Sequence, residues 1–486
     1  MSTTTARIAE WIVQTQYSDL PRRVIEEAKN QILSVVAAVH AGHFSEAGRM
    51  VTRTVKDWGG GKDATLIPSG ERASLHHAIL ANTALSMALD YDDYLVGGHT
   101  GHTAVLVSLA LAEKVGVSGQ EFLVAQTLAN EVAGRVGASV ETGVLDAPRR
   151  GVVHPVGAAV SAAKLLDLDE AAAGAAIALA LTQPPRSLTA GWASGDARVV
   201  LAALTAPAGV QAAQLAASGL RGAADVLDGP EGFSQVFGNP ALPGAYEGWG
   251  KVWLTDTLSY KAYPGAASLG TTIDCVLALA RQHNVDAKRV RAVHVAAGPA
   301  TVDTDAAVAP YLNGPDTPPA ALSGSVAYNV AVALMDRDLT ARQVSRDRMR
   351  DAALWGLMRR VHLTVDDTIG QRTADRSLIK RGAGESAELN LATVDLNGFR
   401  VSCGARVRVE LEDGRSFEAE QEVPYGAAGR PFDERRRSVE DKFRRETRYT
   451  LRKEKMERAV DMILHVEQMN AAHLRELVRL CCSERV

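Results

Sequence analysis

The sequence predicts a mostly α protein, with a large all-helical domain and a smaller α+β domain that carries an antiparallel sheet. Three observations support this fold class. Residues 104 to about 225 show almost unbroken helical spacing of apolar side chains, with no strand pattern of any length between them. After about residue 262, short stretches alternate between apolar and polar side chains, as strands of a half-buried sheet do. From residue 438 onward the helical spacing returns.

The first half of the chain should form a series of helices joined by short polar breaks. Residues 6–41 have the spacing of two amphipathic helices. Three glycines at 59–61 should interrupt the chain before a short extended piece, and a helix should follow over 73–88. Two later blocks, 157–166 and 170–181, are very rich in alanine, and their small side chains let helices approach closely.

The second half should begin with a helix over residues 268–282. Alternating apolar and polar residues then predict strands near 293–295, 361–365 and 407–411. Two dipeptides of the kind that form hairpin turns accompany these strands, Asn397-Gly398 and Asp413-Gly414. These features together predict the antiparallel sheet.

The C-terminal region should be helical over about 439–452 and again over 455–481. The triplet Arg435-Arg436-Arg437, just before it, is expected to be a solvated face. At 486 residues the chain is long enough for two or three domains. We therefore divide it into a helical domain (1–262), an α+β lid (263–430) and C-terminal helices (431–486) that pack back on the first domain.

Composition excludes several classes of protein. The 53 Lys and Arg nearly balance the 57 Asp and Glu, so the chain lacks the excess of positive charge that is typical of nucleic-acid-binding proteins. Its longest apolar block, 171–181, is well short of a membrane span, and residues 1–5 lack the features of a signal peptide. The four cysteines are scattered and form no metal-binding pattern. We expect a soluble cytoplasmic protein with free thiols.

The densest group of titratable side chains lies in the first quarter of the chain. Three carboxylates, two phenols and two imidazoles stand within thirteen positions, separated by turns that contain glycine. If this stretch is helical, Asp90, Asp93 and Tyr94 share one face. Thr100 or Thr103 could cap the next helix, whose free N–H groups would form a binding site for a carboxylate. The alternative is an ordinary helix end, a polar loop and another helix start.

Three of the twelve histidines stand at helix edges beside glycine or proline. They are His99, His102 and His154, and Arg149 and Arg150 lie just upstream of the last. This setting favours a role in a site over a structural one. The remaining histidines sit on helices or strands, or lack acidic company, and we expect them to be structural.

A lysine at the predicted domain junction is a further candidate. Lys261 stands ahead of Tyr263-Pro264, where it could hold a substrate carboxylate, serve as an acid or base, or be an exposed linker residue. No dinucleotide fingerprint, phosphate loop or nucleophile elbow is present, which argues against nicotinamide, ATP and serine-hydrolase chemistry. Histidine, lysine, tyrosine and aspartate at helix edges suit proton transfer beside a carboxylate. The corresponding reactions are β-elimination of water, decarboxylation and epimerisation.

The motifs and their order resemble the MmgE/PrpD family, which includes 2-methylcitrate dehydratase, cis-aconitate decarboxylase and iminodisuccinate epimerase. The resemblance runs nearly end to end, and the ordered set is more specific than any single motif. The matching stretches are 89–93 (LDYDD), 99–113, 153–166, 227–233 (LDGPEGF), 261–264 (KAYP), 325–328 (SVAY) and 442–444 (KFR).

The resemblance implies a helical domain built from both chain ends, an α+β lid, a site between them, a homodimer, and neither metal nor cofactor. The family's active-site aspartate matches Asp90, and the threonine that follows its acidic motif becomes Tyr94. The first histidine best matches His102, although a small shift would place His99 there. The remaining family positions match His154, Lys261 and Tyr328.

Several side chains depart from the family pattern. The proline of the first histidine turn is replaced by a threonine, Thr103 or Thr100. Arg198 replaces a family lysine. An arginine keeps the positive charge and binds carboxylates well, but it is a poor proton donor. The other replacements are Leu201 for the histidine after that lysine, Ala266 for a histidine or cysteine beyond KxYP, and Met87 for a histidine before LDFDD.

The leading hypothesis is a cofactor-independent lyase, a dehydratase or decarboxylase, acting on a small di- or tricarboxylic acid of the methylcitrate or aconitate type. An epimerase or isomerase of a dicarboxylate, and a catalytically silent binding paralogue, are the alternatives. Asp90 or Asp93 would orient an imidazole. The residues expected to be catalytic are His154, His102, His99, Lys261, Asp90 and Tyr328, and those expected to bind substrate are Arg198, Asp93, Tyr94 and Arg150.

Overall fold

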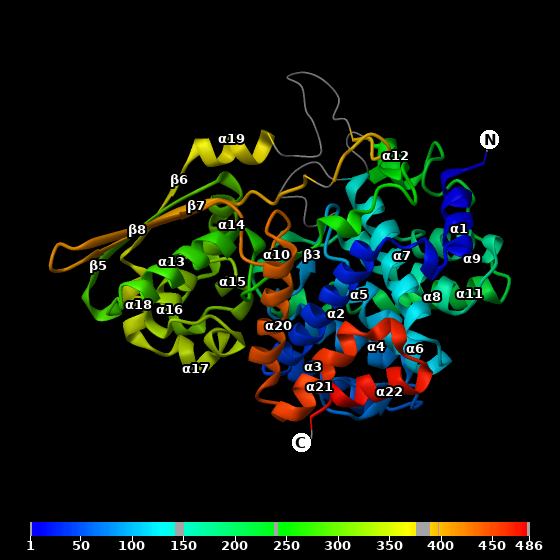
Figure 1. Ribbon diagram of the computed structural model, residues 1–486, viewed down its shortest axis with the longest axis horizontal. Coiled ribbons are helices and arrows are strands. Elements are labelled where there is room, and N and C mark those ends of the chain that lie inside the picture. The colour runs from blue at the N-terminus through cyan, green and yellow to red at the C-terminus, as the bar shows by residue number, and fades with distance from the viewer. Residues whose placement is uncertain (1, 141–149, 238–241, 376–388, 397, 484–486) are drawn as a thin grey trace.

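The computed structural model describes residues 2–140, 150–237, 242–375, 389–396 and 398–483. It consists of a large helical part and a smaller part with a four-stranded sheet, which we call the lid (Figure 1). The predicted fold class is therefore confirmed. No helix in the described ranges is both long and apolar enough to cross a membrane.

The helical part is organised around two long buried helices, α2 (Arg22–His43) and α7 (Gly119–Ala138). The other helices of this part are α1 (Thr4–Gln14), α3 (Glu46–Trp58), α4 (Leu75–Met87), α5 (Gly101–Ala104), α6 (Leu106–Val115), α8 (Val153–Leu165), α9 (Glu170–Ala180), α10 (Thr189–Ala193), α11 (Ala206–Ala217) and α12 (Phe233–Phe237).

Small side chains allow the alanine-rich helices α8, α9 and α11 to pack closely. A β-carbon at Gly209 of α11 would lie 2.2 Å from the carbonyl oxygen of Pro155 in α8, so only glycine fits there. The resulting tight layer holds the first turn of α8 in a fixed position, and that turn carries a residue of the site.

The lid contains a sheet with the strand order β6-β5-β7-β8, covered on one face by α13 (Gly270–Gln282) and α16 (Val326–Asp336) (Figure 1). The strands are β5 (Val290–Ala297), β6 (Val361–Val365), β7 (Ala405–Leu411) and β8 (Ser416–Gln421), and the smaller helices are α14 (Pro299–Val308), α15 (Pro319–Leu322), α17 (Arg346–Met349), α18 (Ala352–Met358) and α19 (Asp367–Asp375).

The sheet differs from the expected one in a single pairing. Strands β5 and β6 are parallel, while β5–β7 and β7–β8 are antiparallel. Several helices separate β5 from β6 in the chain, and such a crossover returns the chain in the same direction. The predicted turn at Asp413-Gly414 does join β7 and β8, whereas Asn397 lies outside the described residues.

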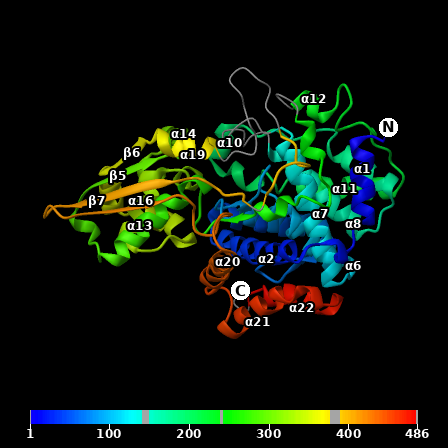
Figure 2. The same ribbon diagram turned by 45° about the horizontal axis from the view of Figure 1, so that its top comes forward.

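The chain ends in α20 (Phe432–Thr447), α21 (Lys453–Leu464) and α22 (Ala471–Leu480). Helix α20 lies alongside α2 in both ribbon views, and α21 and α22 lie against the helical part (Figures 1 and 2). The helix expected over 455–481 is broken between α21 and α22. The residue boundaries that we assigned to the three segments stay a prediction.

The prediction of a solvated arginine triplet was wrong for two of its members. Arg435 forms an ion pair with Glu27 of α2 at 2.7 Å, and Arg436 forms one with Glu26 at 2.8 Å. Only Arg437 is exposed. The spacing of the triplet on α20 directs the first two side chains toward α2, so they fasten one helix to the other.

Candidate active site

The acidic stretch after α4 is a turn and a short strand rather than a helix. Asp90 adopts φ +50°, and Asp93–Tyr94 forms β3, which pairs with β4 (Ser259–Tyr260). The predicted helix face shared by Asp90, Asp93 and Tyr94 is therefore wrong. Asp90 and Asp92 both contact Lys261, whereas Asp93 points to the other side, as alternation in an extended chain requires.

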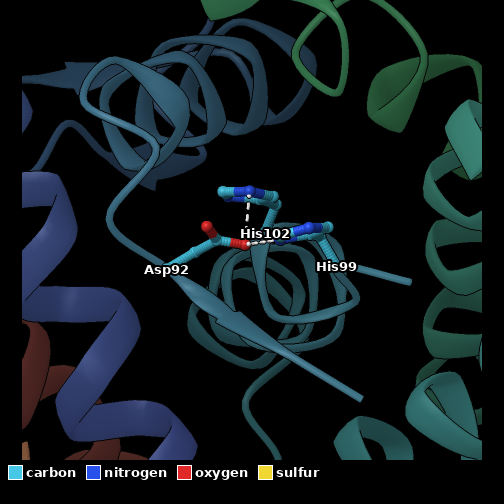
Figure 3. A group of neighbouring side chains, drawn as sticks. All are labelled: Asp92, His99 and His102. Carbon is cyan, nitrogen blue, oxygen red and sulfur yellow. Dashed lines mark hydrogen bonds and ion pairs between the residues drawn. The ribbon is translucent and has the colours of Figure 1, made fainter. Parts of the chain in front are cut away.

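Asp92 is the centre of the site. Its Oδ2 lies 2.8 Å from His99 Nδ1 and 2.9 Å from His102 Nε2, and the two rings approach this oxygen from different sides (Figure 3). Its Oδ1 accepts a hydrogen bond from Lys261 Nζ at 3.0 Å. Burial alone would raise the pKa of Asp92, but the charges of Lys261, His102 and His99 outweigh it and hold that pKa well below its ordinary value.

His102 is tied to the protein through both ring nitrogens. It lies in α5, and its Nδ1 is 2.7 Å from Ser86 Oγ, which also donates to the Thr83 carbonyl. Since the serine hydroxyl has a single proton, His102 Nδ1 carries its own proton whenever Ser86 donates to Thr83. In that arrangement His102 Nδ1 donates to Ser86 Oγ.

The expected threonine cap of this helix is absent. Thr100 precedes α5 but makes no side-chain bond to its N–H groups, and it donates instead to Asn130 Oδ1 at 2.6 Å. Thr103 lies inside α5 and donates to the Thr100 carbonyl. Helix α5 has only four residues, so it offers no seat for a carboxylate.

His154 lies in the first turn of α8 and is 5 % exposed. Its ring centroid is 5.8 Å from that of His102, and its Nδ1 has no hydrogen-bond partner among the described residues. Burial, followed by the nearby charges of His102 and His99, holds the pKa of His154 well below its ordinary value. His154 is therefore a neutral imidazole at physiological pH.

Lys261 is committed to two carboxylates. Its Nζ donates to Asp90 Oδ1, to the Asp90 carbonyl at 3.0 Å and to Asp92 Oδ1. Burial would lower the pKa of Lys261, but Asp90 and Asp92 raise it above its ordinary value. The lysine thus neutralises the turn and short strand of residues 90–93, which we call the acidic turn. It is not an exposed linker residue.

Arg198 connects the helical part to the lid. The guanidinium donates to the carbonyl oxygen of Trp192, to Ser323 Oγ, and at 3.0 Å to the Ala320 carbonyl of α15. It also stacks 4.2 Å from the centroid of Trp192 and lies 3.7 Å from Asp90 Oδ2. Arg198 and Ser323 are buried, whereas Trp192 and Ala320 are partly exposed.

These side chains surround a cavity of about 80 Å³. The lining includes a polar side with the three histidines and an apolar side with Met87 and Leu201, two of the positions that depart from the resemblance. Its full set of residues is Met87, Asp90, His99, His102, Gly151, His154, Ser187, Trp192, Arg198 and Leu201. All of them belong to the helical part, and the lid reaches the cavity through its contacts with Arg198.

Comparison with known proteins agrees with this architecture. A family model described as the MmgE/PrpD N-terminal domain matches residues 6–244, and the MmgE/PrpD C-terminal domain matches residues 263–468. The chain belongs to the MmgE/PrpD family.

Curated relatives of this MmgE/PrpD chain share about a quarter of its residues. A cis-aconitate decarboxylase-like protein of Aspergillus oryzae is 24 % identical over 99 % of this chain and 97 % of its own length. The cis-aconitate decarboxylase of Aspergillus terreus is 26 % identical over 87 % of this chain and 85 % of its own length. The human cis-aconitate decarboxylase is 26 % identical over 55 % of this chain and 57 % of its own length.

Three residues expected in the site of this family member lie elsewhere. Asp93 accepts a hydrogen bond from Gln31 Nε2 at 2.7 Å inside the helical part. Tyr94 does not line the cavity but a separate small hollow beside Lys261, although its ring centroid is 6.1 Å from that of His99. Tyr328 is fully buried in the lid, where its hydroxyl donates to the Gln343 carbonyl. The positions of these three side chains are set by tertiary packing, which cannot be predicted from the neighbouring sequence.

The side chains of the two arginines upstream of His154 are not described by the structure. Arg149 lies outside the described residues, and Arg150 is described only as the first residue of a short 3-10 helix, Arg150–Val152.

Sequence reasoning missed Asp92 as a site residue. Treating residues 90–93 as extended rather than helical would have placed Asp90 and Asp92 on one side, and Asp93 on the other.

Asp92, His99 and His102 also form a group whose ligand atoms lie within 4.8 Å of one another, the arrangement that a metal ion would use. One nitrogen of each ring lies within hydrogen-bond distance of the same carboxylate oxygen. The ammonium of Lys261, 3.0 Å from the other oxygen, would repel a second cation. The geometry therefore suits charge-assisted hydrogen bonding better than metal binding.

Proposed function

We propose that this MmgE/PrpD chain is a cofactor-independent lyase that removes water or CO₂ from a small di- or tricarboxylic acid of the methylcitrate or aconitate type. One observation carries the proposal. The neutral imidazole of His154, the imidazole of His99, which Asp92 holds through Nδ1, and the guanidinium of Arg198 line one cavity. The names of the curated relatives support the same class of substrate.

In this proposal, Arg198 binds a substrate carboxylate and, for dehydration, His154 takes the proton from the adjacent carbon. For dehydration, the electron pair forms a carbon–carbon double bond while the hydroxyl group leaves with a proton from His99 or His102, so that water is released. For decarboxylation, the carbon–carboxylate bond breaks, CO₂ leaves, and an imidazolium protonates the resulting carbanion. Lys261 keeps Asp90 and Asp92 ionised during either reaction.

His99 is the better placed of the two histidines for proton transfer. Its Nδ1 is held by Asp92, and its side chain is 34 % exposed. Its Nε2 makes no hydrogen bond to any of the described residues. His102 has both nitrogens engaged and is almost fully buried. His102 would then keep Asp92 ionised and positioned.

Two alternatives remain open. An epimerase would use His154 and His99 in turn, one taking a proton from carbon and the other returning a proton to the opposite face. A silent paralogue would bind a carboxylate without turnover. The departures at Arg198, Leu201 and Ala266 favour this last alternative, whereas the assembled histidine cavity argues against it.

Incubation of the purified protein in D₂O with 2-methylcitrate, citrate, cis-aconitate, tartrates and iminodisuccinate, followed by proton NMR, tests the proposal. Loss of water or CO₂ from one acid is the expected result. Exchange of a carbon-bound proton alone would identify the epimerase. Tight binding by calorimetry with unchanged spectra would contradict catalysis and support the binding paralogue.

We also propose a cytoplasmic homodimer. The four cysteines are all free thiols, which suits a reducing compartment, and the dimer is what the family resemblance implies. Light scattering of the purified protein should give twice the chain mass of 51.6 kDa.

A further inference from the structure

Helix α20 touches the acidic turn of the site from behind. Lys442 is 1 % exposed, and its Nζ donates to the carbonyl oxygen of Tyr91, the residue between Asp90 and Asp92. The same Nζ lies 4.2 Å from the centroid of the Tyr91 ring and donates to Ser34 Oγ of α2 at 2.9 Å. One amino group therefore fixes the acidic turn to two long helices.

A second side chain of α20 holds the lysine segment of the site. Arg445 Nη2 donates to the Tyr91 hydroxyl at 2.6 Å and to the carbonyl oxygen of Ala262, the residue after Lys261. The Tyr91 hydroxyl in turn donates to the same Ala262 carbonyl at 2.9 Å. Arg445 and Tyr91 thus join α20, the acidic turn and the Lys261 segment at one buried point.

This support matters because the acidic turn is not a regular element. Asp90 has φ +50°, a left-handed conformation that is unfavourable for a residue with a β-carbon and persists only where the surroundings impose it. The distances from Asp92 to His99, His102 and Lys261 all depend on the path of this turn. An error of about 1 Å in such positions can reduce a rate about 100-fold.

We infer that Lys442 and Arg445 of α20 are positioning residues, which hold Asp92 and Lys261 in the geometry that the histidines require. The inference rests on the proposed function for its kinetic consequence, but the positioning itself can be measured without turnover. It assigns a role to the KFR motif of the C-terminal region, whose lysine is Lys442, although no residue of α20 lines the cavity.

The neighbouring Arg444 provides a matched control. It lies on the same helix, but it pairs with Glu440 and with Glu457 of α21 rather than with any residue near the cavity. Substitution of Arg444 by methionine removes two ion pairs of the same helix and leaves the acidic turn untouched.

The experiment compares the wild-type protein with Lys442→Met, Tyr91→Phe, Arg445→Lys, Arg445→Met and Arg444→Met. Two quantities are measured: kcat and KM on the acid identified in D₂O, and the imidazole ¹⁵N signals of His102 in protein labelled at histidine. We expect Lys442→Met to lower kcat about 10- to 100-fold with a smaller change in KM, and to shift the His102 signals. Arg445→Lys should retain more activity than Arg445→Met because it keeps one donor.

Tyr91→Phe removes only the hydroxyl that links Arg445 to the acidic turn, so it tests that contact even if Lys442→Met does not fold. Wild-type His102 signals and kcat in both Lys442→Met and Tyr91→Phe would overturn the inference, as would equal losses in Arg444→Met. Absence of wild-type turnover would instead overturn the proposed function, and the NMR comparison would still decide whether α20 positions Asp92.

Discussion

At the scale of single residues, Asp92 determines how protons are arranged in the site. It is an acceptor for two imidazoles and one ammonium, and its own pKa is held low, so it stays ionised while its partners exchange protons. An ionised carboxylate next to a ring nitrogen fixes the tautomer and orientation of that ring. The opposite nitrogen of His99 is then the atom available for proton transfer.

His154 is the residue whose removal should affect chemistry most. We expect His154→Ala to lower kcat by about 100-fold or more with the fold intact, because a positioned general base contributes about that much. Its pKa lies well below the ordinary value, so the wild-type rate should fall only when the pH drops far below 6.5. The exposed His473→Ala is the control for loss of a histidine. Wild-type turnover of His154→Ala would rule out this assignment.

Asp93 should make stability depend on pH. Burial first, and the charge of Asp92 second, raise its pKa to about 6 from 3.8, so the native state holds a proton that the unfolded state has lost between these values. Its stabilising contribution is therefore fully present below pH 3.8 and is lost as the pH rises through about 6. Asp93→Asn should remove this slope and raise stability at pH 7 by up to about 3 kcal/mol.

Calorimetry of Asp93→Asn at pH 4 to 7 checks this expectation, with the exposed Asp441→Asn as control. The amide can still accept the hydrogen bond from Gln31. If both variants kept the wild-type dependence on pH, Asp93 would not be the group responsible.

The sequence identified cavity residues where titratable side chains stand at the edges of predicted helices. His99, His102 and His154 stand at predicted helix edges, and all three line the cavity. Asp92 was missed and Asp93 was misplaced because their directions depend on whether the backbone is helical or extended. That choice is made by pairing with Ser259–Tyr260, more than 160 residues away in the chain.

At the scale of elements, the sheet of the lid shows how a turn residue fixes a hairpin. Gly414 joins β7 to β8 with φ +87°, and a β-carbon there would meet no atom within 4 Å. Any cost of Gly414→Ala is therefore conformational, and we expect a loss of about 1–2 kcal/mol. Gly356 in α18 also has free space around it but no positive φ, so Gly356→Ala should stabilise by about 0.5–1 kcal/mol.

Thermal unfolding of the two variants tests this contrast. Both add the same methyl group to the lid, so opposite signs isolate the effect of backbone conformation. Destabilisation of equal size in both would show that the added volume matters instead.

Elements with strong periodicity were predictable, and their interruptions were not. The two N-terminal helices and the helix after residue 268 are close to their expected bounds, because their apolar faces recur at helical spacing. The break between α21 and α22, and the parallel pairing of β6 with β5, depend on contacts with other elements. Short-range patterns carry no information about those contacts.

At the scale of the whole molecule, the buried Arg198 network joins the two parts of the protein. Its guanidinium bonds to the helical part at Trp192 and to the lid at Ser323 and Ala320, and it lies beside Asp90 in the cavity. A ligand carboxylate that binds Arg198 would therefore also act on the closure of the lid.

The final prediction concerns this connection. Arg198→Lys keeps the positive charge beside Asp90, but a single ammonium cannot reach Trp192, Ser323 and Ala320 together. Hydrogen bonds to charged groups contribute about 1.5–3 kcal/mol each, so amides of residues 319–325 should exchange with solvent about tenfold faster or more. Hydrogen exchange with mass spectrometry measures this rate.

The matched control is Arg346→Met. Arg346 also crosses from the lid to the helical part, where it pairs with Glu46, but both side chains are about half exposed, and such pairs contribute about 0–1 kcal/mol. We expect exchange over residues 319–325 to stay at the wild-type rate in this variant. Equal acceleration in both variants would mean that any contact between lid and helical part controls closure, whereas wild-type exchange in Arg198→Lys would show that the buried network does not hold the lid. Faster exchange in Arg198→Lys alone would place control of the lid at the residue that we propose as the substrate-binding cation.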